Sequence, residues 1–212
     1  MKKITYTILA LLALACLGVI IELILWGKIK KNEINFTSNQ SEITESKKEE
    51  TYADASTGER YNIERPSLDE LREYASGTTV IVSSANAKQG DEVVLAVTVI
   101  NNPGILGMSA TLSFDENVMT LASAEKGEAF GDTMELTHSA TLGSGCVFLW
   151  DGLDLEPEQI LDGDILYLKF KLSDSAPSGK YPVSFVLDMD GVYDKELALV
   201  NVTVENGYIT IS

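Results

Sequence analysis

The stretch "GILGMSATLSFDENVMTL", residues 104–121, decides the fold class of this chain. In its middle, large apolar residues alternate with small ones. The apolar set is Met108, Ala110, Leu112 and Phe114, and the small set is Gly107, Ser109, Thr111 and Ser113. This period of two predicts a half-buried β-strand, because successive side chains point to opposite faces of a sheet. One face then lies on a core, and the role of the other, which carries small side chains, needs an explanation.

The rest of residues 78–212 continues the pattern, with short β-rich runs bounded by turn residues. Turn chemistry is clear at Asn101 to Gly104 and at Asn206-Gly207. Strands are predicted near residues 78–83, 91–100, 106–114, 118–124, 134–141, 145–150, 164–172, 181–187, 197–204 and 207–212. Nine or ten strands at this spacing, with little helix, predict an all-β sandwich of two sheets.

The residues before this domain predict a linker. Residues 32–66 are polar, charged and without an apolar period, which is typical of a solvated spacer. Ser67, followed three residues later by Glu70, forms a capping box and predicts a helix over residues 68–75. We therefore expect a polar linker with one short helix over residues 32–77 and a β-sandwich domain over residues 78–212.

The first 31 residues predict a membrane anchor. A nearly unbroken apolar run from Ile4 to Trp26 is flanked by lysines on both sides. As a helix, residues 4–26 would extend about 34 Å, and the hydrocarbon core of a bilayer is about 30 Å thick. Two alternatives stay open: cleavage as a signal after Ala15, or lipid attachment at Cys16 as in bacterial lipoproteins.

The charge of the chain argues against nucleic acid as a partner. The net charge is −16, and residues 78–212 hold 6 Lys+Arg against 20 Asp+Glu. Such an acidic surface repels phosphate backbones and anionic lipid headgroups. We expect neutral or cationic partners for the folded domain.

The residue types offer little for catalysis or metal binding. His138 is the only histidine, which excludes a multi-histidine metal site. Cys146 alternates with Phe148 and Trp150 on the core side of a strand, which predicts a buried structural thiol. Most carboxylates fall in turns, which favours a solvated acidic surface over the paired carboxylates of a glycosidase.

The stretch "DMDGVYD", residues 188–194, invites a comparison with calcium loops. With Gly191 at the sixth place of an EF-hand, Val186 and Leu197 would stand at the first and twelfth places, and neither can ligate calcium. An EF-hand is therefore excluded. An irregular calcium site in this stretch stays an alternative.

Two runs are apolar on both alternating faces, "CVFLW" at residues 146–150 and "LALV" at residues 197–200. If one face packs in the core, Val147, Leu149, Leu197 and Leu199 point away from it. The outer face of an antiparallel sandwich is normally solvated. Either the linker helix or a neighbouring loop covers these positions, or they form an exposed apolar patch for a protein partner, and we favour the patch.

The order and spacing of several motifs resemble the cohesin domains of bacterial cellulosomes over residues 78–212. The motifs are "AKQGDEVVLAVTV" (87–99), "GILGMSATLSFDENVMTL" (104–121), "GCVFLWDG" (145–152), "GDILYLKFKL" (163–172), "APSGKYPV" (176–183) and "VNVTVENGYITI" (200–211). The resemblance implies a nine-stranded jelly-roll β-sandwich, a fold shared with a family of carbohydrate-binding modules. It also implies a non-catalytic domain that binds dockerins, the calcium-loaded modules of carbohydrate-active enzymes and scaffold proteins.

The resemblance further implies which residues contact the partner. In cohesins the outer face that contains the third strand binds the dockerin, and the matching positions here are Gly107, Ser109, Thr111, Val147, Leu149, Leu197 and Leu199. The best-known cohesin type often has Asn and Asp where this chain has Gly107 and Ser109. We therefore expect an apolar contact governed by shape rather than polar bonding from this strand.

The functional expectation is a cell-surface cohesin that takes part in cellulosome assembly for polysaccharide degradation. The anchor at residues 4–26 would hold it in the cell membrane as a single-pass protein with its C-terminal domain outside. No cofactor is expected on this chain, since calcium belongs to the dockerin. The main alternative is a carbohydrate-binding module of the same fold, which would bind polysaccharide. A hydrolase and a self-associating adhesin are further alternatives.

Overall fold

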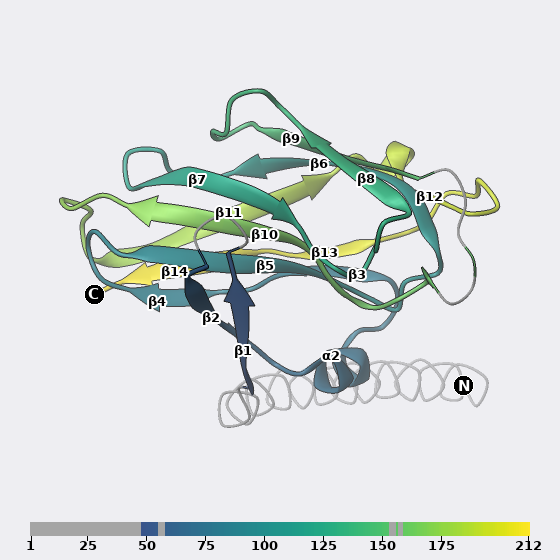
Figure 1. Cartoon of the computed structure of the whole chain (residues 1–212), viewed down its shortest axis with the longest axis horizontal. Helices are drawn as coiled ribbons and strands as arrows, with labels where there is room; N and C mark the ends of the chain where they lie inside the picture. The colour runs from purple at the N-terminus through teal and green to yellow at the C-terminus, as the bar shows by residue number, and fades with distance from the viewer. Residues whose placement is uncertain (1–47, 55–57, 153–155, 157–158) are drawn as a thin grey trace, which may run out of the picture. The chain divides into compact units, whose positions relative to one another are not determined.

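The computed structural model describes residues 48–54, 58–152, 156 and 159–212, which belong to the compact unit Lys47–Ser212 (Figure 1). The anchor predicted at residues 1–31 lies outside the described residues, as does the first part of the predicted linker. Among the residues that are described, no helix is long and apolar enough to cross a membrane.

Two β-sheets face each other across one core, which confirms the predicted all-β sandwich. Sheet 1 has the strand order β13-β3-β5-β10-β7. Its strands are β13 (Thr203–Glu205), β3 (Thr79–Val82), β5 (Glu92–Ile100), β10 (Gly163–Leu172) and β7 (Met119–Lys126). Sheet 2 has the order β4-β14-β11-β6-β9-β8, with β12 paired to β6. Its strands are β4 (Ala85–Ala87), β14 (Gly207–Ile211), β11 (Gly179–Leu187), β6 (Ile105–Ser113), β9 (Val147–Gly152), β8 (Met134–His138) and β12 (Tyr193–Asp194).

The first and last strands of the sandwich pass from one sheet to the other side by side. β3 pairs in parallel with β13 in sheet 1, and β4 pairs in parallel with β14 in sheet 2. If each of these two crossing segments is counted as one strand and the two-residue β12 is left out, the described part of the sandwich has nine strands, the number that was expected. The predicted strand over residues 197–204 is wrong in its extent, because only Thr203–Glu205 joins a sheet there.

Gly207 makes the crossing possible. A Cβ at this position would lie 2.1 Å from the backbone oxygen of Ser83, on the neighbouring crossing segment. We expect Gly207→Ala to lower the free energy of unfolding by about 1–3 kcal/mol, the usual cost of overpacking. Gly107→Ala is the matched control, because nothing lies within 4 Å of its added Cβ and stability should hold. Urea denaturation of both variants checks this, and equal stabilities would contradict it.

The core contains the residues that alternation placed inward. Met108, Ala110, Leu112 and Phe114 on and after β6 are all buried. On the β9 segment, Cys146, Phe148 and Trp150 are buried, and Cys146 is a free thiol, as predicted. His138 is exposed, with Nδ1 2.9 Å from the Ser139 carbonyl oxygen.

Residues 48–65 differ from the predicted solvated linker. They form an antiparallel hairpin of β1 (Lys48–Ala53) and β2 (Arg60–Arg65), which lies alongside β5 (Figure 1). Ile63 is 1% exposed and packs against Val94 and Ala96 of β5. The Tyr52 ring lies 4.3 Å from the Tyr167 ring of β10. The hairpin therefore covers the outer face of sheet 1.

Polar contacts explain why the hydrophilic sequence of residues 48–65 did not predict a hairpin. Asp54 is 2% exposed, and its carboxylate accepts a hydrogen bond from the Lys169 ammonium of β10 at 3.1 Å. Hydrogen bonding with Tyr61 and with Asp54 raises the pKa of Lys169. The phenol of Tyr52 donates to Glu125, and burial together with that bond raises the pKa of Tyr52. Charged and aromatic side chains replace the apolar period that a sequence search expects.

The predicted short helix is confirmed as α2 (Leu68–Tyr74). The Ser67 side chain accepts from the backbone N–H of Glu70, and the Glu70 carboxylate accepts from the N–H of Ser67, so the capping box is formed. Leu71 is buried, and α2 lies beside β5. The helix therefore adds to the cover of sheet 1.

Candidate partner-binding face

The outer face of sheet 2 is the sheet surface that the described part of the chain leaves open. On sheet 1, β5 is buried on both sides from Val94 to Ile100, because the hairpin packs on its outer side. On sheet 2, inward and outward residues of β9 alternate between buried and exposed. One sandwich face is thus covered by other segments of the chain, and no described segment covers the other.

Valine, leucine and threonine side chains form the centre of this face. Thr111 of β6 pairs in register with Val147 of β9 on one side and with Val186 of β11 on the other. Ser109 of β6 pairs with Leu149 of β9. Residues opposite each other in an antiparallel pair have Cβ atoms about 5 Å apart on the same face. These five side chains therefore form one continuous patch across three strands.

A second row of residues borders the patch. Gly107 of β6 pairs with Asp151 of β9 and with Tyr193 of β12. Asp151 pairs in turn with Glu135 of β8. Because an added Cβ at Gly107 would meet nothing within 4 Å, the surface between Tyr193 and Asp151 is open to an approaching group.

Leu197 and Leu199 come from a short hairpin that follows β12. Leu199 forms a β-bridge with Tyr193, which connects it to the row at Gly107. Leu197 stands at the turn with φ of 61°, a left-handed conformation that costs a residue with a Cβ about 1–2 kcal/mol. The Asp194 carboxylate holds the turn by accepting the N–H groups of Glu196 and Ala198 at 3.0 and 2.9 Å.

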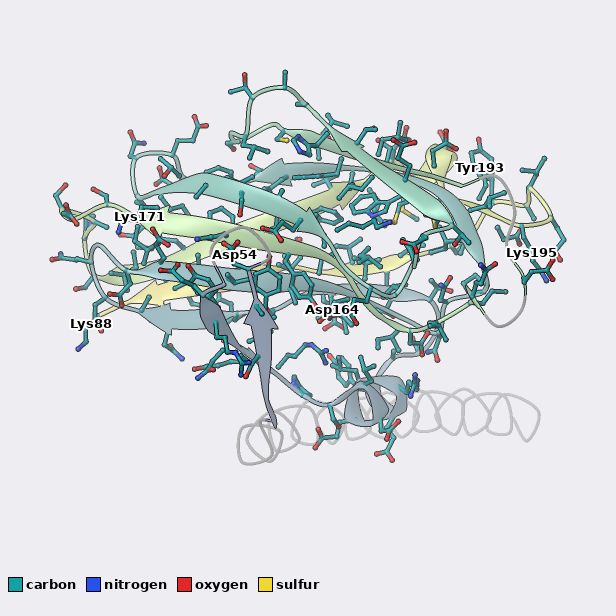
Figure 2. All side chains as sticks on the ribbon, in the orientation of Figure 1. Asp54, Lys88, Asp164, Lys171, Tyr193 and Lys195 are labelled. Atoms are coloured by element: carbon teal, nitrogen blue, oxygen red, sulfur yellow. The ribbon has the colours of Figure 1, made fainter. Side chains whose placement is uncertain are left out.

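The turn therefore presents a leucine at the protein surface in a fixed backbone conformation. Figure 2 shows Tyr193 and Lys195 of this region at the end of the sandwich opposite Lys88 and Lys171. Strained backbone that surrounding bonds hold in place is concentrated at functional sites in proteins. An exposed leucine in such a turn is consistent with a contact role.

The structure brings most of the predicted site residues together. Gly107, Ser109, Thr111, Val147 and Leu149 share one face of sheet 2, and Leu199 joins them through Tyr193. Leu197 is not in register with any strand and lies at the hairpin turn. The exposed fractions of the four apolar residues are 40% for Val147, 44% for Leu149, 73% for Leu197 and 60% for Leu199. The alternative that α2 or a neighbouring loop covers them finds no support among the described elements.

Three exposed apolar residues of this region were not predicted. They are Val186 on β11, Met189 just after it, and Tyr193 on β12. The signal for Val186 was present, because Val183, Phe185 and Leu187 alternate on the core side and leave Val186 outward. Tyr193 carried no such signal, because its position depends on a two-residue strand.

Carboxylates surround the apolar centre. Asp151 and Glu135 are exposed and directly opposite each other, an arrangement of like charges that is unfavourable between strands. Asp188 follows β11 and donates its backbone N–H to the Ser109 carbonyl, so a third carboxylate borders the patch. None of these three forms an ion pair with another described residue. The rim of the face is therefore suited to basic side chains of a partner.

The structure offers no metal centre among the residues it describes. No group of three or more His, Cys, Asp or Glu side chains there is arranged to hold a metal ion. In the stretch considered for calcium, Asp188 precedes the 3-10 turn η2 (Met189–Gly191), Asp190 lies within it, and Asp194 caps the following turn. The arrangement presents a surface rather than a reactive site.

Comparison with known proteins places the sandwich domain in a family. The family model for the cohesin domain matches residues 78–211. Among the curated proteins there is no match.

Solved cohesin structures share the fold. One is a cohesin of a type I cohesin–dockerin complex from Clostridium thermocellum, with 15% identity and a TM-score of 0.55 over 65% of this chain and 100% of that one. Another is a cohesin in complex with a dockerin from Acetivibrio cellulolyticus, with 23% identity and a TM-score of 0.52 over 63% and 98%. A non-cellulosomal cohesin from the archaeon Archaeoglobus fulgidus has 20% identity and a TM-score of 0.53 over 65% and 92%. Because the family model covers more than half of the sequence, this chain belongs to the cohesin domain family, whose members are non-catalytic binding domains.

Proposed function

We propose that this protein binds dockerin modules through the outer face of sheet 2. The observation that carries the proposal is the apolar patch of Val147, Leu149 and Val186, which no described element of the chain covers. Exposed contiguous apolar surface rimmed by polar residues marks protein interaction sites. The complexes from Clostridium thermocellum and Acetivibrio cellulolyticus support a dockerin as the partner.

The mechanism we propose is docking of partner helices on a preformed, nearly flat sheet. Gly107, Ser109 and Thr111 have small side chains, so a helix can approach the backbone of β6 closely. Burial of Val147, Leu149 and Val186 contributes about 1.5–3 kcal/mol for each fully buried side chain, before the costs of association. No covalent step is involved.

The acidic rim orients the partner and raises the rate of its association with this face. Residues 78–212 hold 20 acidic and 6 basic residues, so the domain attracts a partner with basic groups before contact. At the face, Asp151 and Glu135 repel each other, and basic side chains of a partner relieve that repulsion. Calcium is expected in the dockerin, where it orders the docking helices, and not on this chain.

We further propose that residues 1–31 hold the domain at the cell surface. The support is the apolar run of residues 4–26 with lysines on both flanks. The domain would then recruit carbohydrate-active enzymes or scaffold proteins to the membrane from outside the cell, in a cellulosome-like assembly. Fractionation of cells, with protease added to intact cells, tests this placement: a domain that stays in the soluble fraction contradicts it.

The test of binding is calorimetric titration of residues 48–212 with dockerins encoded in the same genome, first with calcium and then with chelator. We expect at least one dockerin to bind with 1:1 stoichiometry in calcium and to lose binding in chelator, because the dockerin unfolds without its metal. A folded domain that binds no dockerin would contradict the proposal.

A carbohydrate-binding role finds less support on this surface. Sugar-binding faces of this architecture present a planar row of aromatic rings, whereas Trp150 is fully buried. The large exposed aromatic residues of the described chain, Tyr74, Tyr193 and Tyr208, lie on three separate elements. Retention on insoluble cellulose would favour that role over dockerin binding.

A further inference from the structure

In the order of the sequence, the β1–β2 hairpin comes after residues 1–47 and before the strands of the sandwich. The chain enters β1 at Lys48, leaves β2 at Arg65, and continues through α2 into β3. Lys48 pairs in register with Arg65, and Ala53 pairs with Arg60 at the closed end. The two points where the chain enters and leaves the hairpin are therefore neighbours at its open end.

This register decides how the hairpin responds to tension. A pull on the residues before Lys48 moves β1 away from Arg65 at the open end. The backbone bonds between β1 and β2 are then loaded pair by pair, beginning with Lys48 and ending at Ala53. A ladder that opens one pair at a time yields at a lower force than one whose bonds must break together.

The sandwich has the opposite geometry. Thr79 begins β3 and pairs with Thr203 of β13, whereas Ala87 at the end of β4 pairs with Ile211 of β14. Because the two segments are parallel, the chain enters the pair at one end and leaves it near Ser212 at the other. A pull between these ends runs along the strands and loads their bonds together, so the sandwich resists it better than the hairpin does.

Among the described side chains of β1 and the residue after it, the contacts with sheet 1 lie near the closed end of the hairpin. Tyr52 stacks on Tyr167 and donates to Glu125, and Asp54, just after β1, accepts from Lys169. These contacts hold the last part of β1 against β10 and β7. Together with the buried Ile63 and the Arg65–Asp164 pair of β2, they set the force at which opening from Lys48 goes to completion.

We propose that the hairpin is a strap that opens under tension from the N-terminal side while the sandwich and its binding face stay folded. Regions with fewer buried contacts open as separate units at lower free energy than the core. Release of residues 48–65 lengthens the connection by about 60 Å, at about 3.4 Å per extended residue. In the cell, this role rests on the proposed anchorage at residues 1–31, whereas the opening is a property of the folded unit.

Optical tweezers on the full chain in detergent micelles test the strap directly. One handle is attached after Ser212, and the other is attached to the thiol of Ser46→Cys. The background carries Cys16→Ser, so that the one further cysteine is Cys146, which is buried and does not compete for the handle. We expect a first step of about 60 Å at low force, followed by a much longer step at higher force. Attachment at Ser76→Cys bypasses the hairpin and should remove the first step alone.

Variants assign the first step to the hairpin. Tyr52→Ala should lower its force or abolish it, Tyr52→Phe should have a smaller effect, and Thr51→Ala, an exposed position of the same strand, should have none. The second step should be the same in all three. A single rupture from the Ser46 attachment, or a Tyr52→Ala effect on the second step, would overturn the strap. Failure of dockerin binding would leave the two steps unchanged, so the two proposals fail separately.

Discussion

Leu149→Asp is expected to weaken dockerin binding by at least about 100-fold, close to 3 kcal/mol. Leu149 lies in the centre of the outer face of sheet 2, opposite Ser109, and is 44% exposed in the free domain. A partner that covers this position would enclose a carboxylate without a counter-charge, and it would lose the buried leucine as well. Calorimetric titration with the dockerin recognised by the unmodified protein measures the change.

The control for this variant is Leu161→Asp, the same exchange at an exposed leucine away from the patch. Leu161 adjoins Asp162, whose carboxylate accepts from Arg72 of α2, so it lies on the side of the molecule that faces the helix. Its substitution should leave the affinity unchanged. Equal affinities for the Leu149 and Leu161 variants, with both domains folded, would show that the partner binds elsewhere.

Asp164→Ala is expected to lower the free energy of unfolding by about 3–5 kcal/mol, the usual cost of breaking a buried ion pair. The Asp164 carboxylate accepts from Arg65 at 3.3 Å, from Tyr167 at 3.0 Å and from Thr98 at 2.6 Å. Both Asp164 and Arg65 are buried where β2 packs on β5 and β10. Thermal unfolding followed by circular dichroism should show a midpoint about 10 °C lower.

Asp69→Ala is the control for the buried pair. Asp69 also contacts an arginine, Arg72 at 2.8 Å, but its side chain is 91% exposed, and exposed pairs contribute little. We expect no measurable change in the unfolding midpoint. If both aspartate variants unfold together with the unmodified protein, Asp164 does not join the hairpin to the sheet in solution.

The position of Tyr167 beside the Asp164 carboxylate predicts that the folded protein loses stability at alkaline pH. Burial, together with the charge of Asp164, raises the pKa of Tyr167 above its usual value near 10. The folded state holds the phenol proton of Tyr167 more tightly than the unfolded state does. The contribution of this phenol to the free energy of unfolding is therefore complete below pH 10. It decreases as the pH rises further.

Much of the sandwich was predictable because its strands are amphipathic. On β6 and β9 one side of each strand is buried and the other is not, so a period of two appears in the sequence and assigns Met108 and Trp150 to the core. The same period assigned Val147 and Leu149 to the outside, and the structure leaves both exposed. The capping box at Ser67 was equally local, and it placed α2 correctly.

The hairpin at residues 48–65 was not predictable in the same way. β1 and β2 meet sheet 1 through paired charges and tyrosines, so their sequences look like those of a solvated spacer. Asp54 and Lys169 are 115 positions apart, and no local pattern connects them. The left-handed turn at Leu197 and the two-residue β12 likewise depend on bonds made by Asp194 and on the edge of β6.

Local alternation was thus sufficient to indicate an all-β sandwich and to name the side chains that point out of it. It could not tell which outward face stays open, because that depends on where distant segments pack. The tertiary structure determines which face stays open, because the hairpin and α2 pack on sheet 1 and the valine and leucine patch of sheet 2 remains exposed. Side-chain direction follows from the backbone period within one strand, whereas cover of a face follows from contacts between residues far apart in the chain.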